Sequence, residues 1–208
     1  MEASGHIEHI LSAVPASRPN ARVTTRTGDG GETSLFGKPR VRKNDPRIEA
    51  LGDLDEAQST IGVARAMAPT SSLGRELLEL QRGLYLAMSE VATPTEDLGR
   101  LPRRLDAAAV ERLDRVLDTV RKSVRIEGRF VIPGENPIAA AVDHARTVVR
   151  RAERRVVECV DAGQVSGAVL LPWLNRASDV LFVLARASER APRPSKKPPR
   201  KPARRAKR

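Results

Sequence analysis

The residues best suited to chemistry in this 208-residue chain are arginines concentrated in one short segment, 145–155. Because successive residues of an α-helix turn by about 100°, Arg146, Arg150 and Arg154 stack on one face of a predicted helix, with Arg151 and Arg155 alongside. We call these five residues the arginine stripe. Apolar residues between them form a face typical of a packed helix: Val142, Ala145, Val148, Val149, Ala152 and Val156. A bound polyanion at the edge of a core and a solvated arginine face paired with Glu153 are two interpretations that we weigh equally.

A glycine-rich segment, 25–34, is the second candidate for chemistry. Its three glycines, its hydroxyl groups and Arg26 suit a loop whose backbone N–H groups approach phosphate closely. The Walker order GxxxxGK[ST] is absent, and an ordinary turn is the commoner interpretation of such a stretch alone. Lys43, ten residues beyond Thr33, adds a cation near a helix start. Loop, lysine and arginine stripe together predict a site for a chain of phosphates.

Four blocks of this sequence also carry a family resemblance. They read TRTGDGGETSLFG, RVRKNDPRIEALGDLDEAQSTIG, FVIPGENPIAAAVDHARTVVRRAERRVV and LPWLNRASDVLFVLARAS. Across residues 22–190, their order and spacing resemble the trimeric ATP:cob(I)alamin adenosyltransferases of the propanediol-utilisation type. The sequence departs from the family pattern at several places, among them Gly30, Gln58, Glu135 and the pair Pro172-Trp173.

The resemblance implies a reaction. A corrinoid adenosyltransferase transfers the 5′-deoxyadenosyl group of ATP to the cobalt of cob(I)alamin, giving adenosylcobalamin and triphosphate. ATP and cobalamin would be the substrates, Mg²⁺ would bridge the phosphates, and the active unit would be a homotrimer. A cobalamin reductase or an adenosylcobalamin-dependent enzyme are the protein partners that this reaction suggests. The chain's three histidines form no convincing metal site of their own.

The resemblance also assigns site residues. The positions matching the family's ATP contacts are Thr25, Arg26, Thr27, Gly28, Thr33, Lys43, Arg150, Arg151, Glu153, Arg154 and Asn175. It implies a catalytic set of Asp55, Arg146 and Arg150, in which Asp55 pairs with Arg146. Phe130 matches a phenylalanine that keeps the lower axial ligand off cobalt. The alternatives are a solvated acid for Asp55 and a core aromatic for Phe130.

Two other classes of function remain open at this stage. The departures at Gly30, Gln58 and Glu135 leave room for a non-catalytic protein of the same fold that binds or delivers ATP or cobalamin. A nucleic-acid-associated protein is the weakest alternative, because the chain has only 2% aromatic residues for base stacking.

The net charge of +11 comes almost entirely from the C-terminus. Residues 191–208 hold nine of the 37 Lys and Arg residues and no acid, which leaves 28 basic against 26 acidic residues elsewhere. This proline-broken tail has no apolar periodicity, so we expect it to be disordered and to contact nucleic acid or an anionic surface, if it contacts any partner. Residues 1–21 are expected to be a weakly structured extension.

Cysteine usage and hydropathy bear on the compartment. The single cysteine, Cys159, excludes an intramolecular disulfide and fits a reducing environment. No membrane span or signal-peptide pattern is recognised, so we expect a cytoplasmic protein.

Apolar periodicity predicts five helices in an all-α bundle preceded by the glycine-rich loop. The first three span about 46–68, 71–92 and 103–125. The fourth starts at Pro137 with Asn136 as its cap and carries the arginine stripe, and the fifth starts near Pro172. We predict one helical domain over residues 22–190.

Overall fold

The helices found in the computed structural model follow the predicted order. The structure describes residues 24–36, 40–124, 126 and 130–189, and the expected N-terminal extension and basic tail lie outside this part of the chain. In it, five α-helices are present: α2 (Pro46–Ala66), α3 (Ser72–Ala92), α4 (Ala107–Arg121), α5 (Pro137–Asp161) and α6 (Leu170–Glu189). A 3₁₀ helix, η1 (Thr95–Arg100), joins α3 to α4. The prediction of an all-α bundle is confirmed.

Side-chain caps explain where the helices begin. Asp45 accepts a hydrogen bond from the Arg47 backbone N–H at 2.9 Å, and Asn136 accepts one from Ala139 at the same distance. A proline follows each of these two caps, where its missing N–H costs nothing. Both predicted starts are confirmed, because a cap is a local signal that needs no tertiary partner.

Two helix starts differ from the predicted ones, by four residues and by two. The helix expected from 103 begins at Ala107, because Asp106 is extended and its carboxylate caps Ala109 at 2.8 Å. The helix expected from Pro172 begins at Leu170, since a proline is tolerated in the first turn of a helix.

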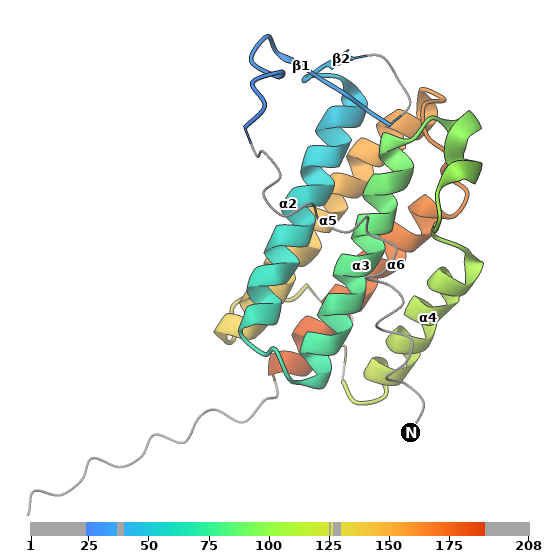
Figure 1. The fold of residues 1–208 in the computed structure, drawn as a ribbon. Helices are drawn as coiled ribbons and strands as arrows, with labels where there is room; N and C mark the ends of the chain where they lie inside the picture. The colour runs from blue at the N-terminus through green and yellow to red at the C-terminus, as the bar shows by residue number, and fades with distance from the viewer. Residues whose placement is uncertain (1–23, 37–39, 125, 127–129, 190–208) are drawn as a thin grey trace, which may run out of the picture.

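The bundle consists of α2, α3, α5 and α6 around one apolar core, with α4 packed on the outer side of α6 (Figure 1). Helix α5 packs extensively against both α2 and α6. The largest fully buried side chains are Leu54, Ile61, Leu77, Leu80, Leu84, Leu113, Leu170, Leu174 and Leu181, with Val91, Val142 and Val149. Branched aliphatic side chains therefore fill the core, as the scarcity of aromatic residues requires.

One close approach in the core depends on a glycine. The indole of Trp173 on α6 lies directly over Gly83 of α3, where a Cβ atom would stand 2.0 Å from Trp173 Cζ2. Because any larger residue at position 83 would collide with the ring, Gly83 sets how closely α3 and α6 pack.

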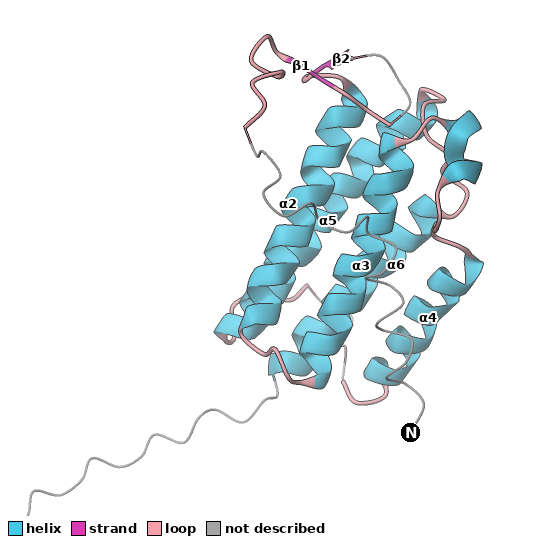
Figure 2. Ribbon diagram, viewed as in Figure 1, coloured by secondary structure: helices cyan, strands magenta, loops and turns pink. Residues whose placement is uncertain are grey.

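A short hairpin that the sequence did not predict stands at the start of α2. Strand β1 (Glu32–Thr33) pairs antiparallel with β2 (Val41–Arg42), and Glu32 lies opposite Arg42 (Figure 2). Two-residue strands are too short to show an alternating pattern, so the sequence carried no strand signal. The hairpin ties the glycine-rich loop to the N-terminal end of α2.

Within the described residues, no helix has the length and apolar character needed to cross a membrane.

Candidate functional site

The glycine-rich loop and Lys43 lie against each other, as their predicted roles require. A Cβ atom built on Gly28 would stand 3.1 Å from Lys43 Nζ, so the lysine ammonium group rests on the backbone of the loop at this glycine. The Lys43 backbone N–H donates to the Gly31 carbonyl at 2.9 Å. The strand pairing thus brings a cation against loop N–H groups that could bind phosphate.

Arg40, which sequence reasoning missed, binds two backbone carbonyl groups of the glycine-rich segment. Its Nη2 donates to the Thr27 carbonyl at 2.5 Å and to the Glu32 carbonyl at 2.8 Å. Its Nε also lies 3.6 Å from Glu32 Oε2. Arg40 lies in a basic run with Arg42 and Lys43, which marks this segment as positively charged. The run does not indicate which carbonyl groups Arg40 binds.

Arg26 adopts an uncommon backbone conformation within the loop. Its φ is +62°, in the left-handed region that residues with a Cβ rarely enter. The hydroxyl groups of Thr25 and Thr27, on either side, are 2.9 Å apart. Backbone strain of this kind often accompanies binding sites, where the rest of the structure holds it in place.

Four members of the arginine stripe divide into two groups with different partners. Arg151 and Arg155 face α2, where Arg151 Nε lies 3.4 Å and Arg155 Nε 3.8 Å from the carboxylate of Asp53. Arg151 also forms an ion pair with Glu56, and Arg155 Nη1 lies 3.1 Å from Glu158. Hydrogen bonds to Glu56 and Glu158, respectively, raise the pKa of Arg151 and of Arg155.

Acids of the same chain therefore neutralise this part of the stripe. Of its two members, Arg151 was predicted to contact ATP, and its side chain already has these acidic partners before any ligand is present.

The second group consists of Arg150 and Arg154, and Glu153 near Arg150 contacts α6. Arg150 Nη1 lies 4.0 Å from Glu153 Oε2, and Asn175 Nδ2 of α6 donates to Glu153 Oε1 at 3.2 Å. Arg154 is exposed and donates to the Arg150 carbonyl at 3.0 Å. The structure thus brings together Arg150, Glu153 and Asn175, with Arg154 one turn further along α5.

The ion pair expected between Asp55 and Arg146 is not formed within the described chain. Arg146 Nε instead lies 3.4 Å from Asp143 Oδ1, because a residue three positions earlier on the same helix is already adjacent. Asp55 is exposed on α2. The carboxylate that contacts Arg146 in this chain is therefore Asp143, a residue that sequence reasoning did not select.

The alternative interpretation of Phe130 as a core aromatic is wrong. Its side chain is fully exposed, and Ile132 beside it is 91% exposed. These residues lie just before α5, at the end of the bundle opposite the loop, because α2 runs from the loop while α5 runs antiparallel to it. A 21-residue helix such as α2 is about 30 Å long, so the loop and Phe130 are far apart in one chain.

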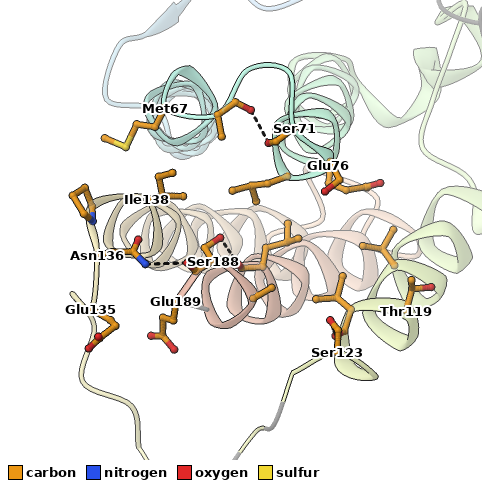
Figure 3. A pocket seen from close by; sticks show the side chains of 18 of the residues that line it. Met67, Ser71, Glu76, Thr119, Ser123, Glu135, Asn136, Ile138, Ser188 and Glu189 are labelled. Atoms are coloured by element: carbon orange, nitrogen blue, oxygen red, sulfur yellow. Dashed lines mark hydrogen bonds between the residues drawn. The ribbon is translucent and has the colours of Figure 1, made fainter. Parts of the chain in front are cut away.

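A pocket of about 1250 Å³ lies near the start of α5, and Figure 3 shows side chains that line it. It is lined mainly by apolar atoms of α3, α4, the start of α5 and the end of α6. Asn136 donates to the Ser188 carbonyl at 2.9 Å and Ser71 to the Ala68 carbonyl at 2.8 Å, so these polar side chains bind the protein's own backbone. None of the predicted site residues lines this pocket.

Among the described residues, no three His, Cys, Asp or Glu side chains gather in a group that could hold a metal ion.

Comparison with known proteins identifies the family of this chain. The profile of the cobalamin adenosyltransferase family matches residues 23–188, and the chain belongs to that family. It is 40% identical to a corrinoid adenosyltransferase of Mycobacterium leprae over 176 residues, which cover 80% of this chain and 91% of the relative. It is 38% identical to the corrinoid adenosyltransferase PduO of Salmonella typhimurium, of which it covers 49%.

Solved structures of PduO-type ATP:corrinoid adenosyltransferases are similar to this fold. A PduO-type ATP:corrinoid adenosyltransferase from Lactobacillus reuteri, in a phenylalanine-to-alanine variant complexed with cobalamin and ATP, superposes with a TM-score of 0.73 at 32% identity. The match covers 81% of this chain and 93% of that one. An arginine-to-lysine variant complexed with ATP gives a TM-score of 0.74 at 31% identity, with 81% and 94% covered. The resemblance inferred from four sequence blocks is confirmed.

Proposed function

We propose that this chain is an enzyme that transfers the 5′-deoxyadenosyl group of ATP to the cobalt of reduced cobalamin. A cobalt–carbon bond forms at C5′, the C5′–O bond breaks, and its electron pair leaves with triphosphate. Membership of the cobalamin adenosyltransferase family supports this proposal, as do relatives named for the same activity. The single structural observation that supports it is the contact of Lys43 with the glycine-rich loop, because a cation beside loop N–H groups would bind the phosphates of this leaving group.

The cations would act on the leaving group. Negative charge develops on triphosphate as cobalt displaces it from C5′, so positive groups aimed at the phosphates lower the barrier. The loop positions Thr25, Arg26, Thr27, Gly28 and Thr33 would bind the phosphates together with Lys43. On α5, Arg150 and Arg154 are the exposed members of the stripe that form no ion pair with an acid of α2. Mg²⁺ would enter with the phosphates of ATP, as part of the substrate.

We further propose that the active unit is a homotrimer in which neighbouring subunits share the ATP site. Within the described residues, no hydrogen bond or ion pair links the loop to Arg150 or Arg154. Asp55 and Phe130 are both exposed, so each is free to meet a neighbouring chain. Pairing of Asp55 with Arg146 and placement of Phe130 over cobalamin would then be contacts completed by assembly.

The reaction also defines the setting of the enzyme. Cob(I)alamin is a strong reductant, so a protein that reduces cobalamin must supply it and an adenosylcobalamin-dependent enzyme consumes the product. The lone, buried Cys159 is compatible with a cytoplasmic location, which we propose.

The decisive experiment incubates the purified protein with ATP, Mg²⁺ and chemically reduced cobalamin. We expect the absorption spectrum of adenosylcobalamin to appear, with stoichiometric release of triphosphate, and no change without ATP. If the protein binds ATP but forms no adenosylcobalamin at saturating substrates, it is a binding protein of this fold and the enzyme proposal fails.

Sharing of the site is tested separately by mixing two inactive variants. Lys43→Ala removes the loop cation and Arg150→Ala removes the helix cation. If each site takes its loop from one subunit and its helix from another, random 1:1 trimers regain about one quarter of the intact sites. If both sets of residues come from the same chain, mixing restores nothing.

A further inference from the structure

A line of polar contacts joins α4 to the predicted ATP contacts. Arg176, on the first half of α6, donates from Nε to Asp114 Oδ1 of α4 at 2.8 Å. The other arm of the same guanidinium donates from Nη1 to Asn175 Oδ1 at 3.3 Å. One planar group therefore holds both a carboxylate on a neighbouring helix and the amide of Asn175.

The amide of Asn175 is bound at both ends. Its oxygen accepts from Arg176, while its Nδ2 donates to Glu153 Oε1 at 3.2 Å. Since a side-chain amide has one accepting and one donating end, these two partners set its orientation. Glu153 in turn lies 4.0 Å from Arg150, so the contacts continue to the arginine predicted to bind triphosphate.

We propose that Arg176, held by Asp114, is a positioning residue that orients Asn175 and, through Glu153, Arg150 for binding ATP. This inference rests on the proposed function, because it assumes that Asn175 and Arg150 touch ATP. Arg176 contacts Asp114 and Asn175, so its effect would be to pre-organise the side chains that bind ATP. When neighbouring residues already hold the binding side chains in place, the ligand binds more tightly because less conformational entropy is lost on binding.

The exposure of the ion pair between Arg176 and Asp114 indicates that it contributes little to the stability of the fold. The side chains of Arg176 and Asp114 are 40% and 49% exposed, and ion pairs this exposed contribute little to folding. Removing either residue should therefore leave a folded protein whose ATP contacts are less well ordered.

The chain offers a matched control on the same helix. Arg112 of α4 donates from Nη2 to Glu76 Oε2 of α3 at 2.9 Å, with side chains 35% and 32% exposed. This ion pair also anchors α4, at nearly the same distance, but it makes no contact with Asn175. Arg112→Ala therefore removes a comparable ion pair of α4 but leaves the hydrogen bonds of the Asn175 amide in place.

The experiment compares wild-type protein with Arg176→Ala, Asp114→Ala, the double variant and Arg112→Ala. For Arg176→Ala we expect KM for ATP to rise about fivefold to tenfold, and for Asp114→Ala about twofold to fivefold. Both should keep the wild-type KM for cobalamin and melting temperature, and the double variant should lose less than the product of the two. Arg176→Lys, which keeps the charge but not the fork, should recover only part of the loss.

Two results would overturn the inference: an unchanged KM for ATP in Arg176→Ala, or an equal rise in Arg112→Ala. Direct measurement of ATP dissociation constants by calorimetry separates this failure from failure of the proposed function. If wild-type protein transfers the adenosyl group while Arg176→Ala binds ATP equally well, only the positioning role is refuted. If wild-type protein does not bind ATP, both proposals fall together.

Discussion

Asp143 of α5 and Arg186 of α6 form an ion pair inside the helical bundle, with 3% and 5% of their side chains exposed. Arg186 also lies 3.0 Å from Glu189 and stacks over the Phe182 ring, with its guanidinium carbon 5.3 Å from the centroid. The other oxygen of Asp143 faces Arg146 at 3.4 Å. The buried carboxylate therefore joins the helix that carries the arginine stripe to its neighbour, next to a predicted catalytic residue.

Breaking this buried pair should destabilise the protein strongly. Asp143→Ala leaves the buried Arg186 guanidinium with only the more exposed Glu189 as a carboxylate partner, and breaking a buried pair costs up to about 3–5 kcal/mol in the free energy of unfolding. Replacing both partners with apolar residues, as in Asp143→Leu with Arg186→Met, removes the unpaired charge and should recover most of that loss. Urea unfolding followed by circular dichroism measures both values. Equal destabilisation in the single and double variants would show that the lost charge pair is not the cause.

The contact between Gly28 and Lys43 gives a test of the phosphate loop. Gly28→Ala places a Cβ 3.1 Å from Lys43 Nζ and 3.3 Å from Cε, so the flexible lysine end must move by a few tenths of an ångström. We expect the affinity for ATP to fall about threefold to tenfold, because a charged contact is displaced without being removed. Gly30→Ala is the matched control, since its Cβ would meet nothing within 4 Å. Equal effects of the two variants would indicate that loop flexibility, not the lysine, determines affinity.

The division of the arginine stripe predicts different effects for neighbouring arginines. Arg154→Ala should weaken ATP binding and slow transfer about tenfold to a hundredfold, since a charge-assisted hydrogen bond contributes roughly 1.5–3 kcal/mol. Arg155→Ala, one residue away, should leave transfer close to wild type, because Arg155 faces Asp53 and Glu158. Alanine favours helix, so neither change should unfold α5. Steady-state kinetics with varied ATP measures both, and wild-type behaviour of Arg154→Ala would refute its role.

Burial of Cys159 predicts both low reactivity and a pH effect. Desolvation raises the pKa of this fully buried thiol, with the nearby Arg47 acting in the opposite direction. The native protein should therefore react with a disulfide reagent only as fast as it unfolds. The folded thiol keeps its proton at higher pH than the unfolded thiol, whose pKa is about 8.5. The contribution of Cys159 to the free energy of unfolding is therefore fully present below about pH 8.5. It falls as the pH rises from there toward the pKa of the folded thiol.

Cys159→Ala is the control for this pH effect, because it removes the titrating group. The variant should show a smaller fall in the free energy of unfolding between pH 8 and 10. Rapid labelling of the native wild-type protein at pH 8 would contradict the burial of the thiol.

Much of the fold was determined by local features of the sequence. Asp45 followed by Pro46, and Asn136 followed by Pro137, predicted two helix starts correctly because a cap and its helix are within four residues of each other. The apolar periodicity predicted five helices because burial of one face repeats every three or four residues. The four sequence blocks were sufficient to identify the family, since they combine residue type with order and spacing over most of the chain.

The partners of the charged side chains were decided only by the tertiary structure. Spacing placed five arginines on one side of a helix, but it did not show that Arg151 meets Asp53 on α2 while Arg150 lies beside Glu153. Asp143 and Arg186 are 43 residues apart, and nothing local marks the acid as the partner of that arginine. The sequence of a helix determines which residues share a face, but not which neighbouring helix that face contacts. The packing of α2, α5 and α6 therefore determines which charged side chains meet.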